Sequence, residues 1–202
     1  MSCSTPCKSP MVLSKVRLHA WPQVLITLCL VWLCACADVQ ASSSPVPPAE
    51  LARELEKPVL AGSGRLRWLG IPVYDASLWT EPLFVPERFG AHAFALEIRY
   101  ARSISGSILA DASLKQMQAL DLVPSGRHAA WLQALTGALP DVKPGDRLTG
   151  MHLPDKGLRL YFNGQLHKVI DDPLLSQTFF AIWLSPATQE PRLRAQLLGL
   201  GT

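Results

Sequence analysis

The stretch RLTGMHLPDKGLRLYFNGQLHKVI, residues 147–170, decides the fold. It holds three short runs, 147–153, 157–162 and 165–170, in which apolar residues alternate with polar ones or dominate. The last two runs are separated by Asn163-Gly164, a dipeptide typical of two-residue β-hairpins because both residues tolerate a positive φ. The stretch therefore predicts an antiparallel meander of three strands.

Two regions upstream of the meander also have strand character. Residues 65–80 predict two extended arms joined by a tight turn at Gly70-Ile71-Pro72. Residues 93–100, AFALEIRY, place Glu97 and Arg99 on one face and four apolar or aromatic side chains on the other. Such alternation is typical of a strand with one face on the core.

Four helices are expected around these strands. Ser105 can cap a helix running to about residue 120. Its apolar sector consists of Ile108, Leu109, Ala112, Ala119 and Leu120, and the polar residue Gln116 lies within the same sector. A second helix is expected at 127–138, a third after Asp172-Pro173, and a last one closed by Gly199. The order predicts an α+β domain in which an antiparallel β-sheet packs against a layer of helices.

The first 41 residues have the features of a leader. Lys15 and Arg17 precede an apolar run at residues 24–37, which is shorter than the roughly 20 residues of a membrane-spanning helix and matches a secretory signal peptide. Cleavage before Ser42 is one alternative. The other is a bacterial lipobox, LCAC, that makes Cys36 a lipidated first residue, and an uncleaved anchor is a third. We therefore expect an exported protein, periplasmic or held at a membrane as a lipoprotein.

The residues after the leader divide into a linker and a domain. Residues 42–50, SSSPVPPAE, are rich in serine and proline and offer little to bury, so 42–58 are predicted to be a linker. The regular patterns above then define one domain at 59–202. Membrane contact is expected only through the leader or a lipid anchor.

Composition excludes several classes of function. Of the net charge of +3, most comes from the leader, so the body is close to neutral and no nucleic-acid partner is expected. All five cysteines lie in the first 36 residues, which excludes disulfides and thiolate chemistry from the body. Apart from His19 in the leader, the histidines stand on separate elements, and His152 and His167 either face each other across the meander or are surface strand residues. We therefore predict no metal site and no cofactor.

Asp171-Asp172 is the one adjacent pair of carboxylates that precedes a helix. Two such groups can act as acid and base when their pKa values are split. The preferred interpretation is a helix N-cap with a second acid near the helix dipole.

Three blocks of the body carry a resemblance to a known family. They are GSGRLRWLGIPVYDASLW, FALEIRYARSISGSILADASLKQM and the long block from PGDRLTG to FFAIWLSP. In this order they resemble the bacterial branch of the chalcone isomerase-like family over most of residues 60–199. The resemblance implies an open-faced β-sandwich with an apolar cleft between sheet and helices. Plant members close a chalcone into a flavanone, and sister members bind fatty acids without catalysis.

The resemblance also points to site residues. Active members use an arginine on the first strand, a threonine, a tyrosine and an asparagine. The arginine position falls on Leu66 or on a neighbouring arginine, and because adjacent strand residues face opposite ways, only one of the two arginines is expected to reach the cleft. The ligand-binding candidates are Arg65, Arg67, Tyr74, Leu109 and Gln116. The alternative is that the arginines are solvated, Tyr74 is half-buried in the sheet and Gln116 is hydrogen-bonded in the core.

By the resemblance, the threonine position falls near Tyr74, the tyrosine position on Leu109 and the asparagine position on Gln116. Leu109 removes the hydroxyl of the tyrosine, so no residue is predicted to be catalytic. The sequence favours a non-catalytic protein that binds a fatty acid or similar small apolar ligand. One alternative is an isomerase, an intramolecular lyase acting on a chalcone-like enone. Another is an envelope interaction module whose cleft is filled by its own side chains, which a cavity smaller than about 300 Å³ would favour.

Overall fold

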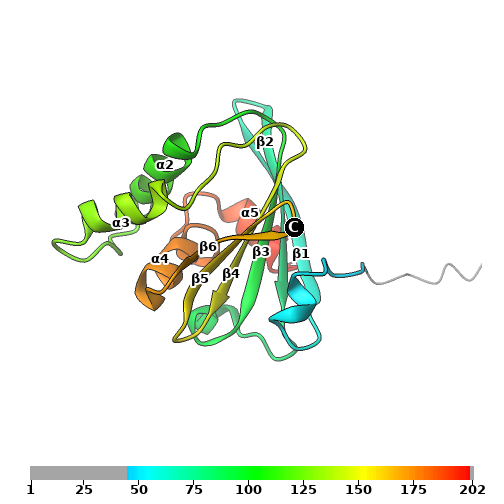
Figure 1. The fold of residues 1–202 in the computed structure, drawn as a ribbon. Helices are drawn as coiled ribbons and strands as arrows, with labels where there is room; N and C mark the ends of the chain where they lie inside the picture. Colours follow the sequence, from blue (N-terminus) through cyan, green and yellow to red (C-terminus); the bar gives the residue numbers. More distant parts are fainter. Residues whose placement is uncertain (1–44, 201–202) are drawn as a thin grey trace, which may run out of the picture. The chain divides into compact units, whose positions relative to one another are not determined.

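The structure, a computed structural model, describes residues 45–200 (Figure 1). The elements, with η for short 3-10 helices, are η1 (Leu51–Arg53), β1 (Val59–Trp68), β2 (Ile71–Thr80), η2 (Pro86–Ala91), β3 (Phe94–Tyr100), α2 (Gly106–Ala119), α3 (His128–Thr136), β4 (Arg147–Leu153), β5 (Gly157–Phe162), β6 (Gln165–Ile170), α4 (Pro173–Leu184) and α5 (Pro191–Leu197). The predicted leader and Cys36 lie outside the described residues.

A six-stranded sheet forms the centre of the described part, and its strands lie side by side in sequence order. Every neighbouring pair is antiparallel. The helices α2, α3 and α4 lie on one side of the sheet in Figure 1. The predicted α+β class and the meander are both confirmed. Asn163 and Gly164 have φ values of 50° and 87°, as the two-residue turn requires.

Local capping fixes the starts of two helices. The Ser105 hydroxyl accepts a hydrogen bond from the amide of Ile108, so it caps α2 as expected. Asp172 accepts from the amide of Leu175 at the start of α4, and its other oxygen accepts from the indole of Trp131 at 3.0 Å. Asp172 is therefore a structural N-cap that also joins α3 to α4.

The main core lies on the helical face of the sheet. The alternating residues of β3, Phe94 to Tyr100, are buried there as predicted. They pack with α4, whose residues from Leu175 to Leu184 are mostly buried. Because α4 is apolar on nearly all sides, it lies between the sheet and the outer helices.

The orientation of α2 differs from the expected one. Its buried residues are Ala110, Leu114 and Met117, whereas Ile108, placed in the apolar sector, is exposed. The reason is that apolar residues occur on two sides of α2, and the helix packs mainly against α3 and α4 rather than the sheet. The sector that contains Ile108 and Gln116 consequently faces a space beside the sheet.

The outer face of the sheet has a smaller core of its own. Residues 50–55, which contain η1 and are called the η1 segment below, lie on this face. Their side chains Leu51 and Leu55 cover Trp79, Ala95 and Met151. The sequence predicted a linker up to residue 58 and a domain that starts at residue 59. In the structure, packing onto the sheet already begins at Leu51. Within residues 45–200, no helix combines the length and the hydropathy that a membrane crossing requires.

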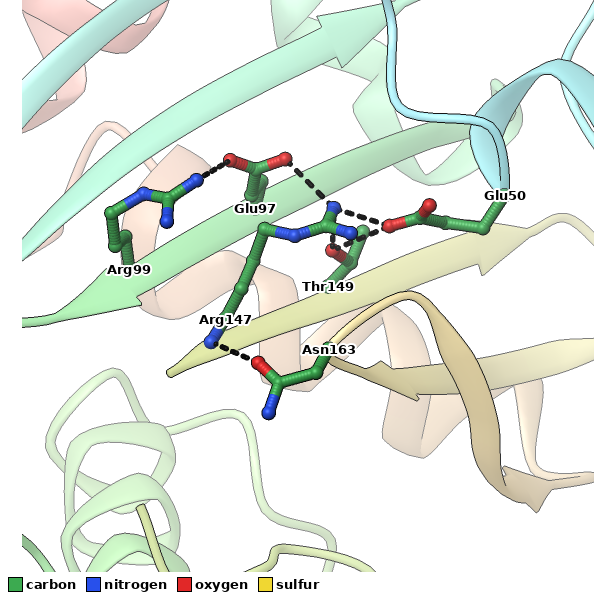
Figure 2. A network of polar contacts seen from close by, with 6 residues as sticks. All are labelled: Glu50, Glu97, Arg99, Arg147, Thr149 and Asn163. Atoms are coloured by element: carbon green, nitrogen blue, oxygen red, sulfur yellow. Dashed lines mark hydrogen bonds and ion pairs between the residues drawn. The ribbon is translucent and has the colours of Figure 1, made fainter. Parts of the chain in front are cut away.

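Ion pairs hold the η1 segment on the outer face (Figure 2). Buried Glu50 pairs with Arg147, whose guanidinium also donates to Glu97 at 3.1 Å and lies against the hydroxyl of Thr149. Glu54 accepts a further hydrogen bond from the Tyr161 hydroxyl at 3.0 Å. The chain entering the domain is thus held by both apolar and charged contacts.

Candidate functional site

A cleft of about 210 Å³ lies between the helical face of the sheet, α2 and α4. Apolar side chains make up most of its walls. The sheet contributes Leu96, Ile98, Leu148 and Leu160; α2 contributes Ile108, Leu109 and Ala112; and α4 contributes Phe179, Ile182 and Trp183. The cleft lies beside α2, which packs mainly against α3 and α4, and Ile108, one of the residues that line the cleft, is exposed to solvent.

Two tyrosines provide hydroxyls in this cleft. The Tyr74 hydroxyl accepts a hydrogen bond from the indole N–H of Trp183 at 2.8 Å. Its ring meets Tyr100 edge to face, with centroids 6.2 Å apart. Burial raises the pKa of Tyr74 to about 12 and also raises the pKa of Tyr100. Both hydroxyls therefore stay protonated near neutral pH and can donate a hydrogen bond but not act as bases.

The remaining polar groups of the cleft come from α2. Ser113 donates to the carbonyl of Leu109 at 2.7 Å, so its proton is used within the helix. Gln116 is half-buried and lines the cleft. Its amide can both donate and accept, which suits an uncharged polar head group.

The cleft is free of strongly ionisable side chains. Among residues 45–200, those that line it include no arginine, lysine, histidine, aspartate or glutamate. The same part of the chain contains no group of three or more metal-ligating side chains. A proton transfer near neutral pH would need a group with a pKa in that range, and the described walls do not supply one.

The predicted site residues are divided between the two faces of the sheet. Tyr74, Leu109 and Gln116 line the cleft together, and so does Leu66. Arg65 and Arg67 do not line it. The expectation that one of these arginines reaches the cleft is wrong, because residues two apart in a strand share a face and Leu66, which faces the cleft, lies between them.

The two arginines have partners outside the cleft. Arg65 forms an ion pair with Asp75, opposite it in the register of β1 and β2, at 3.0 Å between Nη2 and Oδ2. Arg67 donates to the carbonyl of Gly70 at 3.1 Å. Of the alternatives that the sequence left open, the structure thus shows solvated arginines and a half-buried Tyr74.

Sequence reasoning did not place Trp183 or Tyr100 in the cleft. Trp183 packs in the core and also fixes the Tyr74 hydroxyl. Tyr100 was placed on the core face of its strand, and the same alternation puts it beside Tyr74. A signal for Tyr100 was therefore present, but none in the sequence joins Tyr74 to a residue 109 positions away.

His152 lies in the core at 1% exposure, so the alternative that makes it a surface strand residue is wrong. Its Nδ1 lies 2.7 Å from the Ser176 hydroxyl and its Nε2 lies 3.0 Å from the carbonyl of Gly90. Because a carbonyl only accepts, Nε2 carries the proton and Nδ1 accepts from Ser176. Burial lowers the pKa of His152, which keeps the ring neutral, and the residue is not part of the cleft.

Three known proteins or families are similar to this chain. Residues 54–199 match the family described as chalcone isomerase-like. An uncharacterized protein of Haemophilus influenzae is 30% identical over 140 residues, which are 68% of this chain and 66% of the relative, just under two thirds of its length. The crystal structure of an Arabidopsis thaliana fatty-acid binding protein covers 71% of this chain and 87% of its own, with a TM-score of 0.57 and 13% identity. This last match shows a shared fold.

Proposed function

This chain belongs to the chalcone isomerase-like family, and we propose that it is a non-catalytic member that binds a fatty acid or similar small apolar ligand. The binding site is the cleft between the sheet and α2. The observation that carries this proposal is the composition of the described walls, which are apolar apart from a few uncharged hydroxyl and amide groups. Such walls suit an acyl chain and offer no acid, base or cation for chemistry.

The same walls argue against the isomerase alternative. By the resemblance, active members place a guanidinium and a tyrosine hydroxyl beside the substrate. In this chain Leu66 and Leu109 line the cleft at these two positions. Losing one donor at a charge-developing site typically costs about 2.7 to 4 kcal/mol of barrier. Tyr74 and Gln116 remain, and they serve to orient a ligand.

The size of the cleft limits the ligand. At roughly 30 Å³ for a group the size of a water molecule, a cleft of about 210 Å³ holds on the order of seven such groups. We therefore propose that an acyl chain of about six to eight carbons fits inside. A longer chain extends through the open side near Ile108, and a charged head group stays in the solvent there, because the described walls hold no cation.

Lipid extraction and thermal unfolding test this proposal together. Protein purified without detergent is extracted with organic solvent and the extract is examined by mass spectrometry. The unfolding midpoint is then measured with fatty acids and alcohols of 4 to about 16 carbons, and we expect the largest rise near six to eight carbons, because a ligand stabilises the state it binds. Empty extracts together with an unmoved midpoint for every chain length would refute ligand binding. The Arabidopsis protein with the same fold is named a fatty-acid binding protein, which makes acyl chains the first ligands to test.

One observation favours a second function, an interaction module without a ligand. The volume of about 210 Å³ lies below the range of about 300 to 1,000 Å³ that is usual for ligand sites. This alternative predicts an unfolding midpoint that no acyl chain moves.

We propose further that the protein is exported. The support is the pair Lys15 and Arg17 before the apolar run at 24–37. Cleavage before Ser42 and lipidation at Cys36 give mature proteins that differ in the mass of the amino-terminal peptide. A Cys36→Ser variant moves from the membrane fraction to the soluble fraction if Cys36 is lipidated, and it is unchanged if cleavage precedes Ser42. Full retention in the cytoplasm would contradict export.

A further inference from the structure

The β1–β2 hairpin ends in an exposed apolar tip, defined here as residues Trp68 to Ile71. Trp68 is 65% exposed, Leu69 82% and Ile71 50%. Three large apolar side chains are thus presented to solvent by four consecutive residues. Single exposed apolar residues are ordinary, but a contiguous group of them marks a contact surface.

The backbone of the tip is strained. Leu69 and Gly70 have φ values of 50° and 79°, which describe a two-residue turn in which Asn-Gly is the favoured pair. In the left-handed region the Cβ of a residue lies too close to the following carbonyl oxygen, which disfavours that backbone conformation for residues other than glycine. Because the Leu69 side chain is exposed, packing within the chain does not compensate for this strain. A strained and exposed leucine beside two further exposed apolar residues points to a role outside the fold.

The tip is continuous with the cleft. Trp68 lies opposite Ile71 in the register, so their side chains share one face of the hairpin. Leu66, which lines the cleft, is two residues before Trp68 on β1, and the register with β2 shifts between Leu66 and Arg67. The strand that forms part of the cleft wall therefore continues directly into the tip.

Cationic side chains border the tip. Arg67 bends over the turn and donates to the Gly70 carbonyl. Exposed Arg102 follows Ala101, whose amide donates to the carbonyl of Val73 on β2. Arg65 is close by but already paired with Asp75. Tryptophan with arginine at the base of an apolar projection is the arrangement found at membrane interfaces, and arginine favours anionic lipids.

We propose that the apolar tip inserts into the interface of an anionic lipid bilayer and brings the open side of the cleft to the membrane. A lipid surface fits better than a protein partner, because a projecting tip of four residues offers much less than the about 800 Å² per partner that stable protein complexes bury. This contact is additional to the leader, which was the expected route to the membrane. Only the passage of ligand between bilayer and cleft rests on the proposed function.

Depth-dependent fluorescence quenching tests the insertion with the full chain. The vesicles contain phosphatidylglycerol and phosphatidylcholine whose acyl chains are brominated, and bromine quenches tryptophan fluorescence. The contribution of Trp68 is the difference in quenching between the wild type and a Trp68→Phe variant. Because the leader is the same in both proteins, its tryptophans contribute equally. We expect quenching of Trp68 on these vesicles and several-fold less on vesicles of phosphatidylcholine alone. Identical quenching in the wild type and Trp68→Phe would overturn the insertion, and equal quenching on both vesicles would overturn the preference for anionic lipid.

A matched pair of leucines gives the second test. Leu83 is 92% exposed with a φ of 76°, so it resembles Leu69, but it follows the opposite end of β2 and stands between Glu81 and Glu87. Leu69→Asn should reduce Trp68 quenching about tenfold, because the loss of one buried leucine side chain weakens membrane binding by that factor or more. The same variant should raise the unfolding midpoint slightly, because Asn-Gly suits the turn. Leu83→Asn should leave the quenching unchanged.

The two proposals fail separately. Leu69→Asn should retain the thermal shift with octanoate, since Leu69 does not line the cleft. If octanoate has no effect on any variant while Trp68 is still quenched, the ligand is wrong and the membrane contact stands. If Leu69→Asn and Leu83→Asn behave alike toward vesicles, the membrane contact is wrong whatever the ligand.

Discussion

The two faces of the sheet differ in how they accommodate polar side chains. On the outer face, charged groups pair with each other under the η1 segment, and the Arg147 and Glu50 side chains are only 17% and 3% exposed (Figure 2). On the helical face, the described walls of the cleft carry no formal charge and leave space unfilled. Within residues 45–200, the indole nitrogen of Trp79 is the one buried side-chain polar atom of the outer face without a hydrogen-bond partner. The helical face, in contrast, has space for a ligand.

This difference separates stability from function. Buried ion pairs are strongly destabilising to break because the remaining charge is left without a partner. An open apolar cleft forfeits packing contacts that a ligand can restore. Substitutions on the outer face should therefore change unfolding alone, and those on the helical face should change unfolding and ligand binding independently.

The largest effect is expected on the outer face. Arg147→Met removes the counterion of buried Glu50 and of Glu97, and we expect the free energy of unfolding to fall by about 3 to 5 kcal/mol in urea titrations. The double variant with Glu50→Gln should recover part of this loss, because it removes the unpaired charge. A single-variant loss that is close to zero would show that the η1 segment does not depend on these pairs.

An intermediate effect is expected at the hydroxyl of the cleft. Tyr74→Phe leaves the indole N–H of Trp183 without its acceptor, which should lower the free energy of unfolding by about 1 to 3 kcal/mol. Binding of an acyl chain with an uncharged polar head group, such as an alcohol, should weaken, while binding of the plain hydrocarbon should not. Tyr100→Phe is the control, since the Tyr100 hydroxyl makes no hydrogen bond within residues 45–200. Equal losses in both variants would argue against a special role for Tyr74.

Filling the cleft should change stability and binding in opposite directions. Ser113→Leu places an apolar side chain in the cleft, and we expect the free energy of unfolding to rise by about 0.5 to 2 kcal/mol while the thermal shift with octanoate disappears. Ser113→Ala keeps the space open and should retain the shift. If Ser113→Leu still responds to octanoate like the wild type, the ligand does not bind in this cleft.

The smallest effect is expected at the exposed pair on the outer face. Arg65 holds the pKa of Asp75 below its usual value of 3.8, mainly through its hydrogen bond. A lowered pKa stabilises the fold above the unfolded value and this contribution is lost as the pH falls through the folded one. Arg65→Ala should hardly move the unfolding midpoint at pH 7, because the pair is exposed, and the small difference from the wild type should shrink as the pH falls below 3.8 and vanish below the lowered pKa of Asp75 in the folded protein. A large loss at pH 7 would contradict the division between the faces.

Local signals in the sequence determined the elements of this protein. Alternation of side chains, the Asn163-Gly164 turn and the caps at Ser105 and Asp172 act over a few residues, so the strands, turns and helix starts were predictable. The resemblance added the family and the candidates Tyr74, Leu109 and Gln116, which the structure places in one cleft.

Only the tertiary structure decided which faces meet. Strand alternation groups Arg65 with Arg67 and sets Leu66 apart, but it does not say which group faces the helices. Periodicity likewise could not choose between the two apolar sides of α2. The partners that settle these choices are distant in sequence, as Tyr74 is from Trp183 and Glu50 from Arg147, and a pattern read over a few residues does not contain contacts of that range.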